Sequence, residues 1–253
     1  MLERVDYDDR QHAVYSAGRA LPAETARLWS EVFARWAGAS KPSTALDLGS
    51  GTGRFTPILA ETFGGRVYGV EPSERMRQRA EQDARHPGVQ YLAGRAEVIP
   101  LPDRTCDLVL MFLVFHHCTD RRRAVAEIRR VLRPGGRVFI RSTFSDRMPD
   151  LLWHRFIPGA RRVEQQMFPT LTEVTELFEA AGLTVLGLDR IRETAAPDLA
   201  TYAQRLRLRA ISTFEHLTAD EIEQGFAALD RAVAAGDTPG PITMDSDLLV
   251  LGA

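Results

Sequence analysis

The stretch that decides the fold is Thr44-Ala-Leu-Asp-Leu-Gly-Ser-Gly-Thr-Gly-Arg54, an apolar run that leads into three alternating glycines. Residues 44–48 have the composition of a buried strand. Gly49, Gly51 and Gly53 let the backbone turn sharply and approach a ligand without side-chain obstruction. The stretch therefore predicts a strand that ends in a ligand-binding turn and is followed by a helix.

A second short apolar strand, Arg66-Val-Tyr-Gly-Val-Glu71, ends in a carboxylate. Such a group can accept hydrogen bonds from both hydroxyls of a ribose, as the acidic residue does in dinucleotide sites. The spacing from Gly51 to Glu71 suits a strand, turn, helix and strand in succession. Together the turn and the carboxylate predict a site for a nucleoside-type cofactor.

The position of the third glycine distinguishes two kinds of cofactor that bind to a glycine-rich turn followed by an acidic residue. A dinucleotide pyrophosphate needs the G-x-G-x-x-G spacing, and here the sixth position is Arg54. The glycine run, preceded by Asp47, instead resembles the first motif of class I S-adenosylmethionine-dependent methyltransferases. A nicotinamide dehydrogenase is therefore the weaker interpretation of the turn.

Four later segments resemble the same family in the same order, and with the glycine run they cover roughly residues 44–143. The chain is similar to the small-molecule methyltransferases called type 11, which are relatives of quinone-biosynthesis enzymes. The resemblance implies S-adenosyl-L-methionine as cofactor and methyl transfer to oxygen, nitrogen or carbon of a small molecule, in cofactor or secondary metabolism. The segments are Gly94-Arg-Ala-Glu97, Ile99-Pro-Leu-Pro-Asp103, the run from Cys106 to His117, and the run from Ala126 to Ile140.

Strands and helices alternate along the chain, which predicts an α/β fold with a mostly parallel sheet and helices on both faces. The resemblance adds that the sheet is Rossmann-like and seven-stranded, with an antiparallel last strand. We expect helices at 55–63, 73–85, 170–181, 197–214 and 218–235, one opened by Pro22 and one capped by Thr119. We expect strands at 44–48, 66–71, 89–93, 107–113, 137–143, 184–191 and 247–251.

One methyltransferase domain is expected to span residues 1–253. Within it we predict an N-terminal cap segment (1–40), a cofactor-binding core (41–143), a lid with the C-terminal half (144–235) and a final strand (242–253). Residues 144–169 show no clear periodicity and are interpreted as the inserted lid. Helices 197–214 and 218–235 fit a dimer surface as well as packing on the sheet, so monomer and homodimer both remain open.

Composition excludes some partners. The net charge of −2 gives no overall attraction to nucleic acid, and the amino-group and cytosine motifs of nucleic-acid methyltransferases are absent. No apolar stretch reaches membrane-spanning length, and the N-terminus is too polar for a secretory signal. Cys106 and Cys118 lack metal spacing and are interpreted as reduced core residues of a cytoplasmic protein. Arginine supplies all but one of the 32 basic residues, which suggests a GC-rich bacterial genome.

The cofactor residues are expected at the carboxyl ends of the parallel strands, where open sheets bind ligands. By resemblance Glu71 holds the ribose, Met76 packs on adenine, and the backbone near Leu113 meets the methionine amine. Relatives often have Asp where this chain has Arg95, so the Ala96 backbone or Glu97 would serve the adenine edge, although Glu97 also fits an exposed loop carboxylate. The expected cofactor set is Arg19, Asp47, Gly49, Gly51, Gly53, Glu71, Pro72, Met76, Ala96, Glu97 and Leu113.

Methyl transfer is an in-line displacement that needs alignment, electrostatics and often removal of a proton, and it needs no protein nucleophile. His116 and His117 follow the fourth strand, and His116 is our candidate to contact or deprotonate the acceptor. The alternative is a hydrogen-bonded pair at a helix start. Adjacent residues point in different directions, so we expect no metal site.

The remaining candidates flank this core. In relatives a Tyr-x-x-x-Arg pattern before a proline folds over the cofactor, which makes Tyr15 and Arg19 candidates for binding the cofactor carboxylate. His12 and Tyr15 join His116 as candidate catalytic residues, and ordinary packing is the alternative for the tyrosines. Arg141 and the lid arginines are hypothesised to recognise an acidic acceptor. The alternative is that they form a solvated basic surface. The lid arginines are Arg147, Arg155, Arg161 and Arg162.

Two further functions keep the fold and the cofactor. One is an enzyme with other chemistry, such as a cofactor-assisted cyclisation, because a fold does not determine a reaction. The other is a non-catalytic module that binds S-adenosylmethionine and activates a partner. No sequence motif identifies the acceptor.

Overall fold

The computed structural model describes residues 15, 18–19, 21–38, 42–237 and 240–253. His12 and the other residues of 1–14 in the predicted cap segment lie outside the described residues. Among the residues that are described, no helix combines the length and the apolar content of a membrane span.

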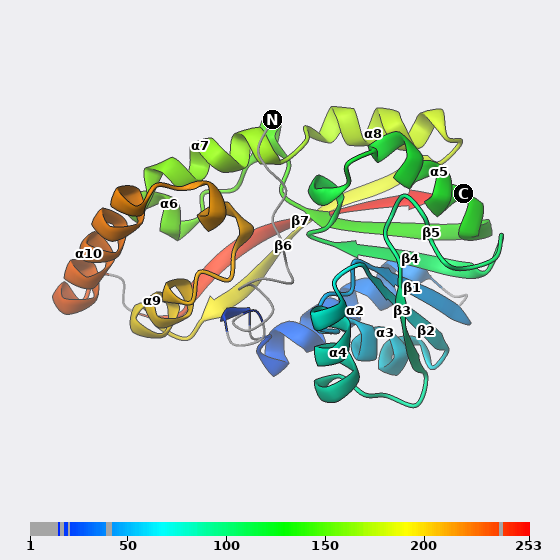
Figure 1. The fold of residues 1–253 in the computed structure, drawn as a ribbon, viewed down its shortest axis with the longest axis horizontal. Helices are drawn as coiled ribbons and strands as arrows, with labels where there is room; N and C mark the ends of the chain where they lie inside the picture. Colours follow the sequence, from blue (N-terminus) through cyan, green and yellow to red (C-terminus); the bar gives the residue numbers. More distant parts are fainter. Residues whose placement is uncertain (1–14, 16–17, 20, 39–41, 238–239) are drawn as a thin grey trace. The chain divides into compact units, whose positions relative to one another are not determined.

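A seven-stranded sheet with the order β3-β2-β1-β4-β5-β7-β6 organises the chain (Figure 1). β1 pairs in parallel with β2 and β4, β2 with β3, and β4 with β5, whereas β7 runs antiparallel to β5. The predicted α/β fold with its antiparallel last strand is confirmed. The strands are β1 (Thr44–Leu48), β2 (Arg66–Glu71), β3 (Val89–Ala93), β4 (Cys106–Phe112), β5 (Leu132–Ser142), β6 (Thr184–Ala196) and β7 (Ile242–Gly252).

The chain order reverses beside β1, because β2 and β4 lie on its two sides. The carboxyl ends of these strands therefore meet at the switch point, where open sheets bind ligands. In Figure 1, α5 and α8 lie together on one side of the sheet, and α2, α3 and α4 lie on the other. These helices are α2 (Ala23–Ala37), α3 (Thr56–Phe63), α4 (Glu74–Asp83), α5 (Arg121–Val131) and α8 (Leu171–Ala180).

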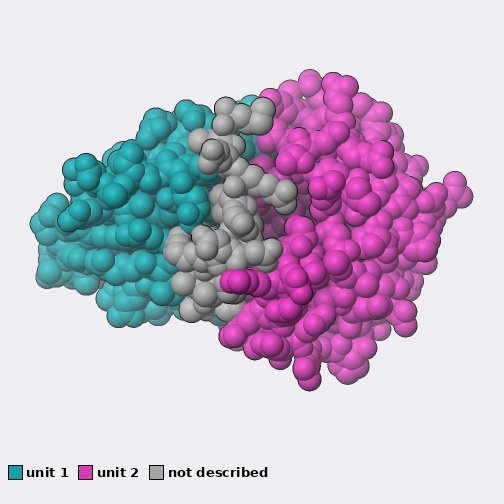
Figure 2. Space-filling view, in the orientation of Figure 1, with its two compact units in different colours: residues 1–22, 143–171, 190–246 teal, residues 23–142, 172–189, 247–253 magenta. Residues whose placement is uncertain are grey.

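The chain divides into two compact units (Figure 2). Unit 2 comprises residues 23–142, 172–189 and 247–253, and unit 1 comprises 1–22, 143–171 and 190–246. Unit 2 holds the sheet strands β1 to β5, and aromatic residues such as Trp29, Phe33 and Phe139 are buried in it. The predicted division of one domain into cap, core and lid stays a prediction.

Unit 1 has a hydrophobic core of its own. Trp153, Phe214, Phe226 and Leu229 are among the side chains that it buries. Its helices are α6 (Leu152–Phe156), α7 (Pro158–Met167), α9 (Leu199–Arg207) and α10 (Ala219–Ala235). Because α9 and α10 bury their apolar residues in this core, their apolar faces are already used inside the unit.

The structure corrects several predicted elements. Residues 144–169, expected to lack periodicity, contain α6 and α7, and α7 buries Ala160, Val163 and Glu164 at helical spacing. Pro158 at its start suits a helix, since proline has no N–H to leave unpaired there. Helix α5 is capped by Asp120 instead of Thr119, through a hydrogen bond from the Arg123 N–H.

Of the two cysteines that were predicted to lie in the core, one is buried and one is not. Cys106 is buried in β4, where burial raises the pKa of its thiol to about 12, so the thiolate is strongly disfavoured. Cys118 is only partly buried, which corrects its assignment to the core. No disulfide joins these two described residues.

Candidate functional site

The glycine turn between β1 and α3 requires glycine for two reasons. Gly49, Gly51 and Gly53 all have positive φ, at 75°, 56° and 78°. In addition, a Cβ on Gly49 would lie 2.5 Å from Cγ1 of Val114, and one on Gly53 would overlap the Tyr91 hydroxyl. The space beside these two glycines is filled by the protein, so a side chain at either position would collide with Val114 or Tyr91. The approach of a ligand to this backbone stays a prediction.

The carboxylate of Glu71 joins the turn to the end of β2. Its Oε2 accepts a hydrogen bond from the Gly51 N–H at 3.0 Å, and its Oε1 accepts from the Ser73 N–H at 2.9 Å. The side chain is only 7% exposed. These two backbone donors fix the orientation of the carboxylate.

Two hydroxyls in the same turn are buried without partners. Ser50 Oγ and Thr52 Oγ1 have no hydrogen-bond partner among the residues that the structure describes. Buried polar groups normally have a partner, so such orphaned groups in a turn are what a polar ligand would satisfy. With Glu71 at the edge of the turn, these residues fit a nucleoside-type cofactor.

Asp47 lies deeper, in β1. Its Oδ2 accepts a hydrogen bond from the Thr56 hydroxyl at 2.7 Å, which ties the strand to the first residue of α3. Burial raises the pKa of Asp47 to about 6, and the nearby Glu71 charge acts in the same direction. The observed contact is structural, and a role in cofactor binding stays a prediction.

The predicted adenine side involves α4 and the loop after β3. Met76 and Ala96 are buried, and Pro72 is exposed, with its carbonyl accepting from Arg77 at 2.9 Å. Their contact with adenine stays a prediction. Arg95 forms an isolated bridge with Val98 in the loop.

Glu97 is not the exposed loop carboxylate of the alternative interpretation, because it is only 9% exposed. Its Oε1 accepts from the Thr119 N–H at 2.8 Å, the Thr119 hydroxyl at 2.9 Å and the Asp120 N–H at 3.3 Å. Burial raises the pKa of Glu97, but hydrogen bonds, including those from Thr119, outweigh that effect and lower it. Glu97 thus holds the start of α5.

The end of β4 has an unusual backbone. Leu113 has a φ of 59°, a conformation that non-glycine residues rarely adopt, and its N–H donates to the Arg141 carbonyl at 2.8 Å. Such a conformation persists only where surrounding structure imposes it, and it is concentrated at ligand sites. It lies where the methionine amine was predicted to bind.

His116 and His117 lie in a short 3-10 turn, Phe115–His117, which begins two residues after Leu113. Their ring centroids are 3.9 Å apart with an interplanar angle of 43°. The expectation that adjacent side chains point apart is therefore wrong, because the tight turn brings the two rings together. Within the described ranges, no three His, Cys, Asp or Glu side chains gather as metal ligands would.

A cluster of aromatic rings and arginines was missed by the sequence reasoning. Phe55 and Phe112 stack with centroids 3.8 Å apart, and the Arg141 guanidinium lies 4.8 Å from the Phe112 centroid. Arg54 lies 5.3 Å from the Phe55 centroid. The only sequence signal was an aromatic residue after the glycine turn and another at the end of β4. Arg141 is 4% exposed, so this cluster holds a buried cation.

The N-terminal candidates belong to unit 1. The Arg19 N–H donates to the Tyr15 carbonyl at 2.8 Å, so a backbone hydrogen bond joins these two residues. Their role in binding the cofactor carboxylate stays a prediction, as does the catalytic role of Tyr15.

The lid arginines also belong to unit 1. Arg162 pairs with Glu221 at 2.9 Å, and Arg161 lies 4.0 Å from Asp150, in pairs that solvent reaches. Exposed pairs of this kind contribute little energy. For Arg161 and Arg162 the surface contacts therefore favour the solvated interpretation.

Comparison with known proteins gives a consistent result. A family model described as "Methyltransferase domain" matches residues 46–140. A ubiquinone/menaquinone biosynthesis C-methyltransferase from Acidiphilium cryptum is 38% identical over 117 residues, covering 45% of this chain and 47% of that protein. An uncharacterized methyltransferase from Geobacillus is 34% identical over 155 residues, covering 56% of this chain and 70% of that protein. The chain thus spans about half the length of the quinone-biosynthesis relatives that it matches.

Solved structures share the fold. A candidate methyltransferase of an antibiotic biosynthesis pathway from Anabaena variabilis superposes with a TM-score of 0.71 at 24% identity, covering 90% of this chain and 97% of that one. The [4+2]-cyclase SpnF superposes with a TM-score of 0.62 at 18% identity, covering 93% of this chain and 84% of that one. At these identities the likeness establishes the fold alone.

Proposed function

Because the chain belongs to the methyltransferase family, whose cofactor is S-adenosyl-L-methionine, we propose that it transfers a methyl group to a small-molecule acceptor. The observation that carries the proposal is the buried Glu71 carboxylate, held by the Gly51 and Ser73 N–H groups beside a turn with two orphaned hydroxyls. Such a carboxylate is pre-oriented to accept from the two hydroxyls of a ribose.

The bound cofactor supplies an electrophilic methyl group on a sulfonium. On the protein side, Glu71 binds the ribose hydroxyls, and the backbone at Leu113 receives the amino acid end. Met76 and Ala96 would line the adenine, and binding of the cofactor carboxylate by Tyr15 and Arg19 stays a prediction. Alignment of this kind is a contribution that a methyltransferase must make, because the displacement requires an in-line approach.

The acceptor side is formed by residues at or just beyond the carboxyl ends of β4 and β5. His116 lies in the turn after β4 and, as a neutral imidazole, takes the proton that an oxygen or nitrogen acceptor releases. Arg141, held over Phe112, gives the site a fixed positive charge. A buried cation favours an acceptor that carries a carboxylate or another acidic group. We propose that the reaction takes place in the cytoplasm.

A second function is kept open by one specific observation. SpnF shares this fold and is a [4+2]-cyclase, so the fold also supports a reaction other than methyl transfer. A rearrangement or cyclisation assisted by the cofactor is therefore the alternative to methyl transfer. Product mass separates the two, because only transfer adds one methyl group.

Calorimetric titration tests the cofactor site. We expect the wild type to bind S-adenosylhomocysteine in the micromolar range and NAD not at all, and Glu71→Ala to weaken the first by at least about tenfold, or ~1.4 kcal/mol. Glu74→Ala is the matched control, since Glu74 is an exposed carboxylate three residues further along the chain. Unfolding curves for each variant show whether it is folded. Binding of NAD alone, or unaltered affinity in a folded Glu71→Ala, would overturn the proposal.

The acceptor hypothesis needs a separate comparison. Pairs of acidic and neutral acceptors of similar shape are offered to the wild type, Arg141→Ala and His116→Ala, and the methylated product is measured by mass. We expect Arg141→Ala to lose its preference for the acidic member, and His116→Ala to lose turnover while keeping S-adenosylhomocysteine affinity. Equal use of both acceptors by wild type and variant would remove Arg141 from acceptor recognition.

A further inference from the structure

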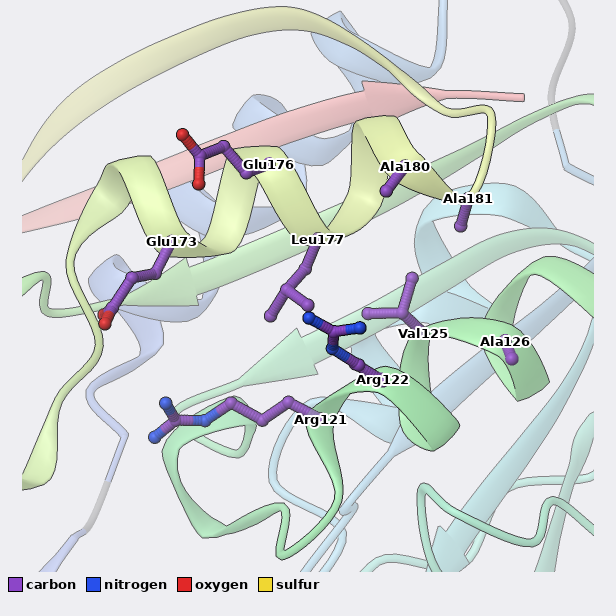
Figure 3. A pocket seen from close by; sticks show the side chains of 9 residues that line it. All are labelled: Arg121, Arg122, Val125, Ala126, Glu173, Glu176, Leu177, Ala180 and Ala181. Atoms are coloured by element: carbon purple, nitrogen blue, oxygen red, sulfur yellow. The ribbon is translucent and has the colours of Figure 1, made fainter.

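A groove on unit 2 lies between α5 and α8 (Figure 3). It has a volume of about 520 Å³. Arginines project from α5 and glutamates from α8, and small or aliphatic side chains line the rest. The lining residues are Arg121, Arg122, Val125, Ala126, Glu173, Glu176, Leu177, Ala180 and Ala181.

The two helices that form the groove have opposite charge. α5 carries five arginines and one glutamate, whereas α8 carries three glutamates and no basic residue. Arg122 and Glu176 are exposed, and neither forms an ion pair within the part of the chain that the structure describes. The Nε atom of Arg121 is buried and likewise has no hydrogen-bond partner among those residues. The Arg122 and Glu176 charges are thus available to a partner.

The start of α5 breaks a local rule of helix design. The N-terminal end of a helix carries partial positive charge and favours acidic side chains, yet α5 begins with three consecutive arginines and has no acidic residue in its first turn. Asp120 at the N-cap and the Glu97 carboxylate, which accepts from the Thr119 and Asp120 N–H groups, oppose them. Arg123 donates to the Glu97 carbonyl at 3.2 Å, which accounts for one of the three. Arg121 and Arg122 remain, and both line the groove.

The mixed charge restricts the occupant. A polyanion that suited α5 would be repelled by the glutamates of α8, and a polycation would meet the reverse problem. A suitable partner must present acidic groups to α5 and basic groups to α8 at the same spacing. The chain itself carries such a surface.

The direction of the helices makes this surface self-complementary. Figure 3 shows α5 and α8 side by side and running in the same direction, with the charged residues toward their N-terminal ends and Ala126, Ala180 and Ala181 toward the other end. Rotation by half a turn about an axis along the groove lays α5 of one copy on α8 of the other. Arginines then face glutamates twice, and alanine-lined ends face each other. A two-fold contact requires a patch of this kind.

We propose that the α5–α8 groove is the contact surface of a two-fold dimer of this chain, in which Arg122 of one copy pairs with Glu176 of the other. The small side chains allow the two helix pairs to approach closely, and the opposite charges set the register.

Charge reversal in the two helices tests the proposal, with sedimentation velocity as the readout. We expect the wild type to dimerise, and Arg122→Glu and Glu176→Arg each to raise the dissociation constant at least about tenfold, as loss of a close interfacial charge pair does. An equimolar mixture of the two single variants should dimerise again, because each mixed contact pairs opposite charges. The mixture distinguishes contact between copies from attraction between α5 and α8 within one chain, which mixing cannot restore.

Arg27→Glu is the matched control, since Arg27 is an exposed arginine on α2 outside the groove, and it should leave dimerisation unchanged. Titration with S-adenosylhomocysteine verifies that each variant is folded. A wild type that stays monomeric at all concentrations would overturn the proposal. So would dimers that survive both single reversals, or a mixture that stays as dissociated as its two components.

Discussion

At the scale of single residues, the packing of the protein itself requires glycine in the turn after β1. Gly53 has a φ of 78°, and its Cβ position is occupied by the Tyr91 hydroxyl and, at 2.7 Å, by Cβ of Ala84. Gly64 also has a positive φ, at 72°, but a Cβ there would meet nothing within 4 Å. A comparison of Gly53 with Gly64 therefore separates the energetic cost of backbone strain from the cost of steric overlap.

We expect Gly53→Ala to lower the free energy of unfolding by about 2–4 kcal/mol, because strain and overpacking add. Gly64→Ala should cost only about 1 kcal/mol, since strain acts alone. Urea unfolding of the two variants measures the difference. Equal losses would show that Tyr91 and Ala84 do not restrict the turn.

Asp47 gives a prediction for pH. Burial raises its pKa to about 6, so the folded protein holds this proton more tightly than the unfolded chain does. Its contribution to stability is therefore fully present at low pH, below the pKa of the unfolded chain, and is lost as pH rises through about 6.

Asp47→Asn removes the charge and keeps an oxygen to accept from Thr56. We expect the variant to be more stable than the wild type at pH 7, by up to about 3 kcal/mol, and the gap to close toward pH 4. Thermal unfolding of both proteins across this pH range measures the difference in stability. A difference that does not change with pH would contradict the raised pKa.

At the scale of elements, the start of α5 depends on a residue far from it in the sequence. Glu97 accepts from the Thr119 N–H and hydroxyl and from the Asp120 N–H, so the loop after β3 holds the N-terminus of a helix that follows β4. The sequence pattern placed the cap at Thr119. In the structure Asp120 caps the helix and Thr119 is a donor to Glu97.

We expect Glu97→Ala to lower the free energy of unfolding by about 1–3 kcal/mol, because three donors lose their acceptor. Glu97→Gln keeps one carbonyl oxygen and should cost less. Hydrogen exchange should show faster opening in the first turn of α5 for the alanine variant. Unaltered exchange there would mean that Asp120 alone holds the helix start.

At the scale of the whole molecule, two compact units each bury a core. Leu229 in α10 and Leu59 in α3 are both completely buried, one in each unit. Replacement of either by alanine should cost about 2–5 kcal/mol through lost burial and a cavity.

The two variants should differ in where protection is lost. Leu229→Ala should speed hydrogen exchange mainly in 143–171 and 190–246, whereas Leu59→Ala should do so mainly in 23–142. Leu59→Ala is expected to weaken S-adenosylhomocysteine binding more than Leu229→Ala does, because the glycine turn and Glu71 belong to unit 2. A uniform loss of protection in both variants would show that the units open together.

What the sequence determined by itself is local. The apolar run at 44–48, the glycines that follow and the carboxylate at Glu71 predicted the first two strands and the turn between them, because strand period and positive φ depend on neighbouring residues. Family resemblance then supplied the antiparallel last strand, which periodicity alone does not encode.

Only the tertiary structure decided which distant residues meet. Three contacts join separate strands or loops. The Thr119 hydroxyl donates to Glu97, the Tyr91 hydroxyl occupies the Cβ position of Gly53, and the Arg141 guanidinium lies over the Phe112 ring. It also placed α6 and α7 in a second core with α10, where the sequence indicated a lid without periodicity. The reason is physical: such contacts follow from which crossovers bring two segments together, and no single segment contains that information.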